Sequence, residues 1–217
     1  MNPDTINYPY ISQILLMTMT VTLTSTTISV LVGFPLGYLL SKNKKFMKPM
    51  RSLTSALTGL PPVVAGLCIY FLVTRNGPLG GFKLLYSPSA MVLAQILIVI
   101  PIVAASVYPA FLRVSQDISE TCAGLRLSGR KTFGLLMREC RFACVSAVMS
   151  GFGRAISEVG AVMLVGGNIA GKTRVMTTAV LTETGRGNYA QAMLLGGLLL
   201  FISVAINLLA GRLRGDS

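Results

Sequence analysis

Long apolar stretches separated by short polar segments dominate the chain and predict helices that cross a membrane. Crossing about 30 Å of hydrocarbon takes roughly 20 helical residues, and five stretches are long enough. They cover residues 11–40, 53–73, 89–112, 141–166 and 190–210. The expected fold class is an all-α membrane protein, with residues 1–217 forming a single transmembrane domain.

One segment of the first stretch has a different pattern. Residues 17–23 alternate Thr with apolar side chains, which is the period of a β-strand. A membrane barrel would need this alternation in every segment, and the other four stretches lack it. A helix satisfies its own backbone in lipid, and Thr hydroxyls can bond back to its carbonyls. We therefore expect a helix here too.

Composition supports a membrane protein and affects how the high net positive charge is interpreted. Apolar residues make up 53% of the chain and charged residues only 12%, about half the charged share of soluble domains. The net charge of +12 could suggest nucleic-acid binding, but the chain has no Trp and its cations lie between the apolar stretches. Membrane lipid is therefore the expected surrounding, and nucleic acid is not an expected partner.

The cations also predict the orientation, because cytoplasmic connections carry the excess of Lys and Arg. Thirteen fall on one side of the predicted topology and five on the other. The larger set is Lys42, Lys44, Lys45, Lys48, Arg51, Arg113, Arg126, Arg130, Lys131, Arg138, Arg141, Arg212 and Arg214. The smaller set is Arg75, Lys83, Lys172, Arg174 and Arg186. This places the N-terminus outside and the C-terminus in the cytoplasm.

Residues that support catalysis or metal binding are scarce. The chain has no His, no CxxC pair, no paired carboxylates and no GxSxG motif. We expect no catalytic residue, no metal site and no enzyme activity of the chain itself.

The connection of residues 113–140 is the longest one between predicted spans. Asp117 and Glu120 have the spacing of a capping box, which predicts a helix starting at Asp117. Ser128 and Gly129 interrupt that helix before a second one. Such an amphipathic segment can fill a groove on a soluble partner or lie on the membrane surface, and the pattern leaves both readings open.

The fourth stretch contains two ionisable residues one helical turn apart, Arg154 and Glu158. A charge within the hydrocarbon costs at least about 2.5 kcal/mol unless it is paired or hydrated. The two residues are therefore candidates for a translocation pathway or gate. A structural ion pair is the favoured interpretation, because Glu158 offsets the positive charge that an anion would need. Either residue can also find its partner on another helix.

Residues 166–173 match the nucleotide-binding pattern GxxxxGK[ST]. The predicted topology places this segment outside the cell, and no Asp follows a later apolar strand to bind Mg²⁺. We therefore interpret it as an external loop, in which Lys172 and Arg174 can help to receive an anion.

Three segments resemble the permease subunits of binding-protein-dependent ABC importers. ETCAGLRLSGRKTF (120–133) resembles their cytoplasmic coupling loop, although Arg126 stands where the motif has Gly. SGFGRAISEVGAVMLVGGNIAG (150–171) and LPPVVAGL (60–67) resemble the molybdate and tungstate branch, most closely the tungstate type. The resemblance implies a type I importer fold, and it adds Pro61 and Pro62 to the candidate pathway or gate residues.

The resemblance also implies the assembly and its location. It implies a homodimer in a bacterial or archaeal cell membrane, two cytoplasmic ATP-binding subunits, and an extracytoplasmic oxyanion-binding protein. Mg-ATP would bind those subunits, and no cofactor would bind this chain. The residues implied to couple to the ATPase are Asp117, Glu120, Ala123, Gly124, Ser128 and Gly129.

The expected function is therefore the import of tungstate or molybdate through the dimer interface. The alternative is a stand-alone anion channel or an ion-coupled carrier that uses Arg154 and Glu158. A third reading, a membrane ATPase built on residues 166–173, would require the chain to bind nucleotide by itself.

Overall fold

The computed structural model describes residues 8–42, 47–124 and 128–214, without the side chains of residues 8, 115–124, 209–210 and 213–214. These residues form helices and no strand, which confirms the all-α class. Three helices are long and apolar enough to cross a membrane, namely α1 (Tyr8–Ser41), α4 (Pro88–Gly124) and α9 (Tyr189–Arg214). Two bent helix pairs raise the number of candidate spans to as many as five.

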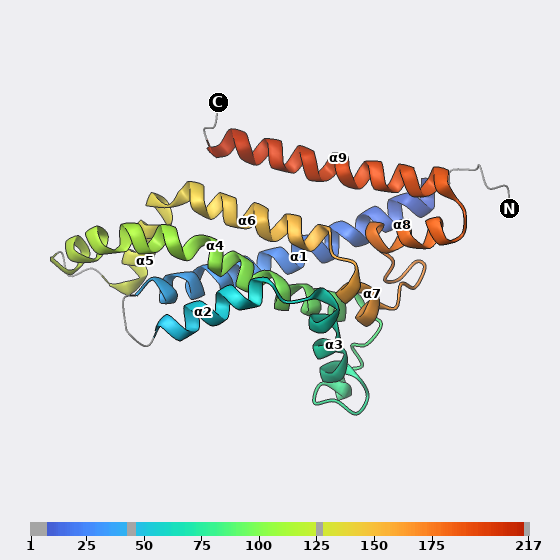
Figure 1. Cartoon of the computed structure of the whole chain (residues 1–217), viewed down its shortest axis with the longest axis horizontal. Helices are drawn as coiled ribbons and strands as arrows, with labels where there is room; N and C mark the ends of the chain where they lie inside the picture. Colours follow the sequence, from blue (N-terminus) through green and yellow to red (C-terminus); the bar gives the residue numbers. More distant parts are fainter. Residues whose placement is uncertain (1–7, 43–46, 125–127, 215–217) are drawn as a thin grey trace.

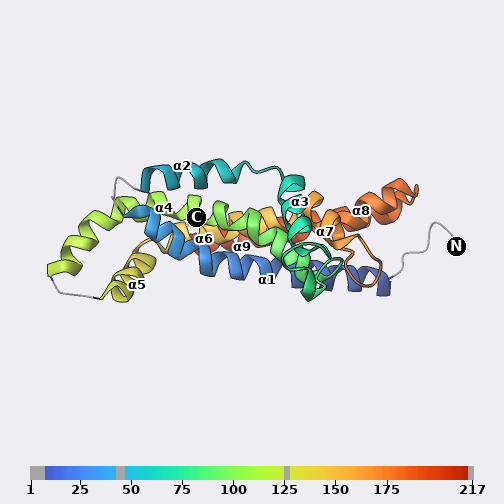
Figure 2. The ribbon, with the colours of Figure 1, turned by 90° about the horizontal axis from the view of Figure 1, so that it is seen from below.

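The long helices run along one axis of the molecule, so their connections gather at two ends (Figure 1). The end of α1, the end of α4 and the short helix α5 (Gly129–Glu139) lie together at one end, called here the α5 end. The start of α1 and helix α8 (Met176–Gly185) lie at the opposite end, called the α8 end (Figures 1 and 2). The two long basic connections therefore share one end, as the predicted alternation of spans requires. Which end faces the cytoplasm stays a prediction.

Helices α1 and α4 pack closely along the middle of the molecule. A Cβ placed on Gly33 would lie 2.8 Å from Val103 Cγ1, so the absence of a side chain lets the two helices approach. The Thr-rich part of α1 is helical, and the Thr18 hydroxyl donates to the Ile14 carbonyl at 2.7 Å. The expected helix with back-bonded Thr is confirmed there.

Helix α4 corrects one sequence prediction. Its candidate membrane span, Pro88–Val114, agrees with the predicted residues 89–112, but a new helix was predicted to start at Asp117. Instead α4 continues without a break to Gly124, so Asp117 lies inside a helix and is no N-cap. The drop in hydropathy marks where apolar side chains end, whereas the backbone hydrogen bonds of a helix continue through polar residues.

The second predicted span, residues 53–73, is two helices and not one. Helix α2 (Met47–Thr58) and helix α3 (Pro62–Val73) meet at an angle of 103°. Pro61 and Pro62 lack the N–H groups that would continue α2, while Pro62 suits the first turn of α3. The N–H groups of Val64 and Ala65 both bond to the Pro61 carbonyl.

The fourth predicted span, residues 141–166, is also broken. Helix α6 (Arg141–Ile156) and helix α7 (Gly160–Gly166) are bent by 56°. The Ser157 hydroxyl donates to the Gly153 carbonyl at 2.8 Å, which helps to end α6. The chain then continues through α8 into α9, which covers the predicted fifth span.

Candidate functional site

The two broken spans contact each other through their second halves. These halves are α3 and α7, and a Cβ on Gly66 of α3 would lie 2.7 Å from the Ala161 Cα of α7. At the breaks themselves, a Cβ on Gly160 would lie 2.9 Å from Val63 Cγ2. The structure therefore places the break at Pro61 and Pro62 beside the break that contains Glu158. We call these two helices the α3–α7 pair.

Arg154 and Glu158 bond to each other across the α6–α7 break. Arg154 Nη1 lies 2.6 Å from Glu158 Oε2, and the Glu158 side chain is only 2% exposed against 29% for Arg154. The pairing within one segment settles the question that the sequence left open. Glu158 is buried and Arg154 is partly exposed, so the ion pair lies at the edge of the core. There the positive charge of Arg154 neutralises the buried carboxylate of Glu158.

The other atoms of Glu158 fix the start of α7. Its Oε1 accepts the Ala161 N–H at 3.0 Å, and its carbonyl accepts the Thr177 hydroxyl at 2.9 Å. A carboxylate that accepts an N–H of the first helical turn also interacts favourably with the helix dipole. Glu158 thus ties the end of α6, the start of α7 and the start of α8 to one another.

A polar contact from α4 and α1 supports the same break, and sequence reasoning missed it. Gln95 is buried, and its Nε2 donates to the Ala155 carbonyl at 3.0 Å. Its Oε1 accepts the Ser25 hydroxyl at 2.6 Å. Ala155 is in the last turn of α6, and its carbonyl also accepts the Glu158 N–H at 3.2 Å. In the sequence, the only sign of this contact is that Gln95 is an amide side chain within an apolar stretch.

The predicted coupling residues lie at the α5 end. Asp117, Glu120, Ala123 and Gly124 fall in the C-terminal part of α4, and their side chains lie outside the described residues. Ser128 and Gly129 are exposed where α5 begins, which confirms the predicted interruption.

Helix α5 folds back onto the bundle rather than standing apart from it. Leu136 is buried in a cluster with Phe111 of α4, and the Phe133 ring lies 5.3 Å from the Tyr38 ring of α1. The end of α4 and α5 together form a helical hairpin, called here the α4–α5 hairpin.

The segment that matches a nucleotide motif is built as a closed structural loop. Helix α7 precedes it, where a phosphate loop would follow a strand. The Thr173 hydroxyl is buried, donates to the Gly166 carbonyl at 2.6 Å and accepts the Ile169 N–H at 2.9 Å. A magnesium ion would need that oxygen, which the loop already uses.

Arg174, which was predicted to help receive an anion, instead bonds to other residues of the protein. It is 9% exposed, bonds to Asn168 through Nε and Nη2, and its Nη1 donates to the Tyr10 hydroxyl at 2.8 Å. The Tyr10 hydroxyl in turn donates to the buried Glu183 at 3.1 Å. Arg174 therefore fixes the loop to α1 and α8, with each of its three nitrogens bonded to a protein oxygen.

Comparison with solved structures identifies the class of membrane protein that this fold represents. The chain superposes on a structure titled as an amino acid ABC transporter with a TM-score of 0.70, covering 98% of this chain and 100% of the other. At 16% identity this match shows the fold alone. The fold shared with that transporter chain is, in this protein, a long continuous α4 beside two broken spans. A scan against protein-family models finds no match.

Sequence comparison then shows the family. The chain is 36% identical over 200 residues to the tungstate uptake system permease protein TupB of Peptoclostridium acidaminophilum, covering 92% of this chain and 88% of that one. It is 33% identical over 215 residues to a probable anion ABC transporter permease protein of Haloferax volcanii, covering 96% and 93%. The chain belongs to the family of permease subunits of anion-importing ABC transporters, and it is a multi-pass membrane protein.

Proposed function

We propose that the chain is the membrane-spanning subunit of an ATP-driven importer of an inorganic oxyanion, either tungstate or molybdate. The observation that carries the proposal is the full-length similarity to permeases named for tungstate and other anions. The substrate would be delivered by an oxyanion-binding protein at the α8 end, outside the cell.

In this proposal, energy enters at the α4–α5 hairpin. Two copies of a cytoplasmic subunit would bind and hydrolyse Mg-ATP and contact Glu120, Ser128 and their neighbours. Because α4 is one helix of 37 residues, it extends about 55 Å at 1.5 Å per residue. It packs against both α3 and α7, so a displacement of the hairpin can reach the α3–α7 pair without crossing a loop.

The α3–α7 pair is the element that we propose to gate the anion pathway. Both of its helices are short, and each joins the rest of its span through a bend. Such a pair can rotate about the bends at Pro61–Pro62 and at Ser157–Glu158, alternately opening and closing a pathway at the interface of a homodimer. Arg154 and Glu158 hold one bend in shape, and the anion passes without binding Arg154 directly.

The direct test is purification of the chain with its partners, followed by transport. An importer subunit should retain an ATP-binding subunit in detergent, and reconstituted vesicles should take up tungstate or molybdate only with ATP and the binding protein. A chain that purifies alone and moves anions without ATP would be a channel or a carrier, and the proposal would be wrong.

Reversing one charge tests the coupling site separately. Glu120→Arg should reduce ATP-driven uptake at least about tenfold, because a repelled contact at a charged interface costs several kcal/mol. Arg138→Glu, an exposed position in the last turn of α5 and away from Ser128, is the matched charge reversal and should have a smaller effect. Uptake by Glu120→Arg equal to that of the parent would remove Glu120 from the coupling role.

A further inference from the structure

A cavity at the outer side of the α3–α7 pair has no role in the proposal above. It measures about 640 Å³ and is lined by Val73, Arg75, Gly80, Gly81, Lys83 and Leu85. That volume falls within the roughly 300–1,000 Å³ typical of ligand pockets. Val73 is the last residue of α3, so the cavity begins where the pair ends.

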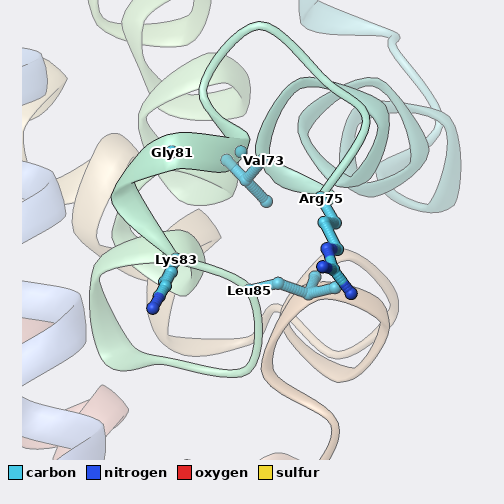
Figure 3. Close-up of a pocket in the computed structure, with 6 residues that line it drawn as sticks. Val73, Arg75, Gly81, Lys83 and Leu85 are labelled. Atoms are coloured by element: carbon cyan, nitrogen blue, oxygen red, sulfur yellow. The ribbon is translucent and has the colours of Figure 1, made fainter.

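The cavity exists because the chain after α3 turns back sharply. A Cβ on Gly80 would lie 2.5 Å from the carbonyl oxygens of Thr74 and Arg75, so only glycine allows this approach. Lys83 follows with a φ of 51° and donates its N–H to the Gly80 carbonyl at 3.1 Å. Arg75 and Lys83 are thereby brought to opposite sides of the cavity, with Val73 and Leu85 between them (Figure 3).

The charge of this cavity is one-sided. Two cations line it and no carboxylate does. Among the residues whose side chains are described, neither Arg75 nor Lys83 forms an ion pair. The buried carboxylates Glu158 and Glu183 already bond to other residues. Arg174 and Arg186 of the α8 end both have protein partners, so Arg75 and Lys83 differ from them.

We propose that this cavity receives a tetrahedral oxyanion dianion, such as tungstate or molybdate, before the anion reaches the gate. The inference rests on the proposed function and adds a site to it. Two cations in the lining match the charge of a dianion, and Arg supplies the planar fork that suits oxyanion oxygens. Because both side chains are exposed, water and salt weaken the contacts. A weak, quickly reversible site is what a station on a pathway requires.

Direct binding tests the site without the delivering protein. The purified permease–ATPase complex in lipid-free detergent is titrated with sodium tungstate at low ionic strength by calorimetry. Arg75→Gln and Lys83→Gln should each weaken binding about tenfold, the usual effect of losing one hydrogen bond to a charged group. The matched control is Arg138→Gln, an exposed cation of α5 outside the cavity lining, which should change affinity less than twofold.

A second pair of variants tests the charge without removing a cation. A Cβ on Gly81 meets nothing within 4 Å, so a longer side chain fits there. Gly81→Glu should abolish tungstate binding, whereas the isosteric Gly81→Gln should retain at least a third of the parent affinity. Equal binding by both variants would show that the charge of the cavity does not hold the anion.

Three other outcomes would distinguish an oxyanion site from the alternative explanations of this cavity. If the parent complex transports tungstate with ATP but binds none in the titration, the cavity site is wrong and the importer stands. If the cavity variants bind tungstate normally but lose affinity for the delivering protein, the cavity docks an acidic side chain of that protein. Binding that disappears in nanodiscs of anionic lipid would assign the cavity to a lipid headgroup. Each of these results overturns the proposal.

Discussion

The break between α6 and α7 depends on a few hydrogen-bonded side chains. Gln95 supplies the only described side-chain bond to the Ala155 carbonyl, and it reaches it from α4. Glu158 closes the same break from the other side through Arg154 and Ala161. A buried polar group without a hydrogen-bond partner destabilises the folded state. Removing one partner of such a bond therefore costs the free energy of leaving the other group less well satisfied.

Gln95→Leu should therefore destabilise the chain by about 1–3 kcal/mol, because two buried hydrogen bonds are lost at once. The Ala155 carbonyl then keeps the Glu158 N–H, and the Ser25 hydroxyl keeps the Thr22 carbonyl. Thermal unfolding of the detergent-solubilised chain measures the effect. Ser106→Ala is the control, since that exposed hydroxyl bonds only to a carbonyl of its own helix. A Gln95→Leu variant as stable as the control would contradict the supporting role.

Arg154→Gln should cost more stability than Arg186→Gln, although both remove an Arg from an ion pair. Glu158 bonds to Arg154 at 2.6 Å and is left with a buried charge, whereas Glu183 keeps Asn188 and Tyr10 as donors when Arg186 is lost. We expect a loss of about 1–3 kcal/mol for the first variant and below about 1 kcal/mol for the second. Thermal unfolding of the two variants measures the difference, and equal losses of stability would show that Arg154 has no special role.

At the scale of the helices, the packing of α3 on α7 is the contact that orders the gate. Gly66→Ala places a methyl group 2.7 Å from the Ala161 Cα, which should push the helices apart at a cost of about 1–3 kcal/mol. The control is Gly134→Ala at an exposed position of α5, where a Cβ meets nothing, and it should stabilise by about 0.5–1 kcal/mol. Unfolding and ATP-driven uptake are measured for both. Normal stability and uptake in Gly66→Ala would show that the close contact is dispensable.

Sequence patterns predicted the helices well and their continuity poorly. Hydropathy located each apolar stretch, because lipid and the protein core select the same side chains. It could not show that α4 passes through Arg113 and Asp117 as one helix, since a helix needs no apolar residues to continue. Pro61 indicated a break, yet the 103° turn depends on the packing of α3 on α7, which comes from residues about 95 positions apart.

The candidate site was found only in part for a similar reason. Arg154 and Glu158 are one turn apart, so local spacing was enough to suggest their pair. The contact of Gln95 with Ala155 spans 60 positions, and the joint position of Arg75 and Lys83 depends on a turn whose path the glycines alone do not specify. Arg174 shows the opposite error, because a cation in a predicted outer loop turned out to be a buried structural residue.

The molecule as a whole has one end that would receive energy and one that would receive substrate. Helix α4 joins them, with the α4–α5 hairpin at one end and contacts to the α3–α7 pair toward the other. The basic connections gather at the α5 end, and the cavity with Arg75 and Lys83 lies beyond the α3–α7 pair. An importer needs the α5 end in the cytoplasm, and a reversed orientation would leave the ATP-binding subunit with nothing to contact.

Site-directed labelling of intact cells with a membrane-impermeant thiol reagent tests this orientation most directly. Single cysteines are introduced as Ser128→Cys and Lys172→Cys, both at exposed positions, in a chain that carries Cys68→Ser and Cys122→Ser. Cys140 and Cys144 are both buried. Burial raises the pKa of the Cys140 thiol, and the negative charge of the neighbouring Glu139 raises it further. Few reactive thiolates therefore form there at neutral pH.

Our account predicts that the cysteine at position 172 is labelled in intact cells and that the one at position 128 reacts only after the membrane is opened. Labelling at position 128 in intact cells would place the α4–α5 hairpin outside and would contradict the importer.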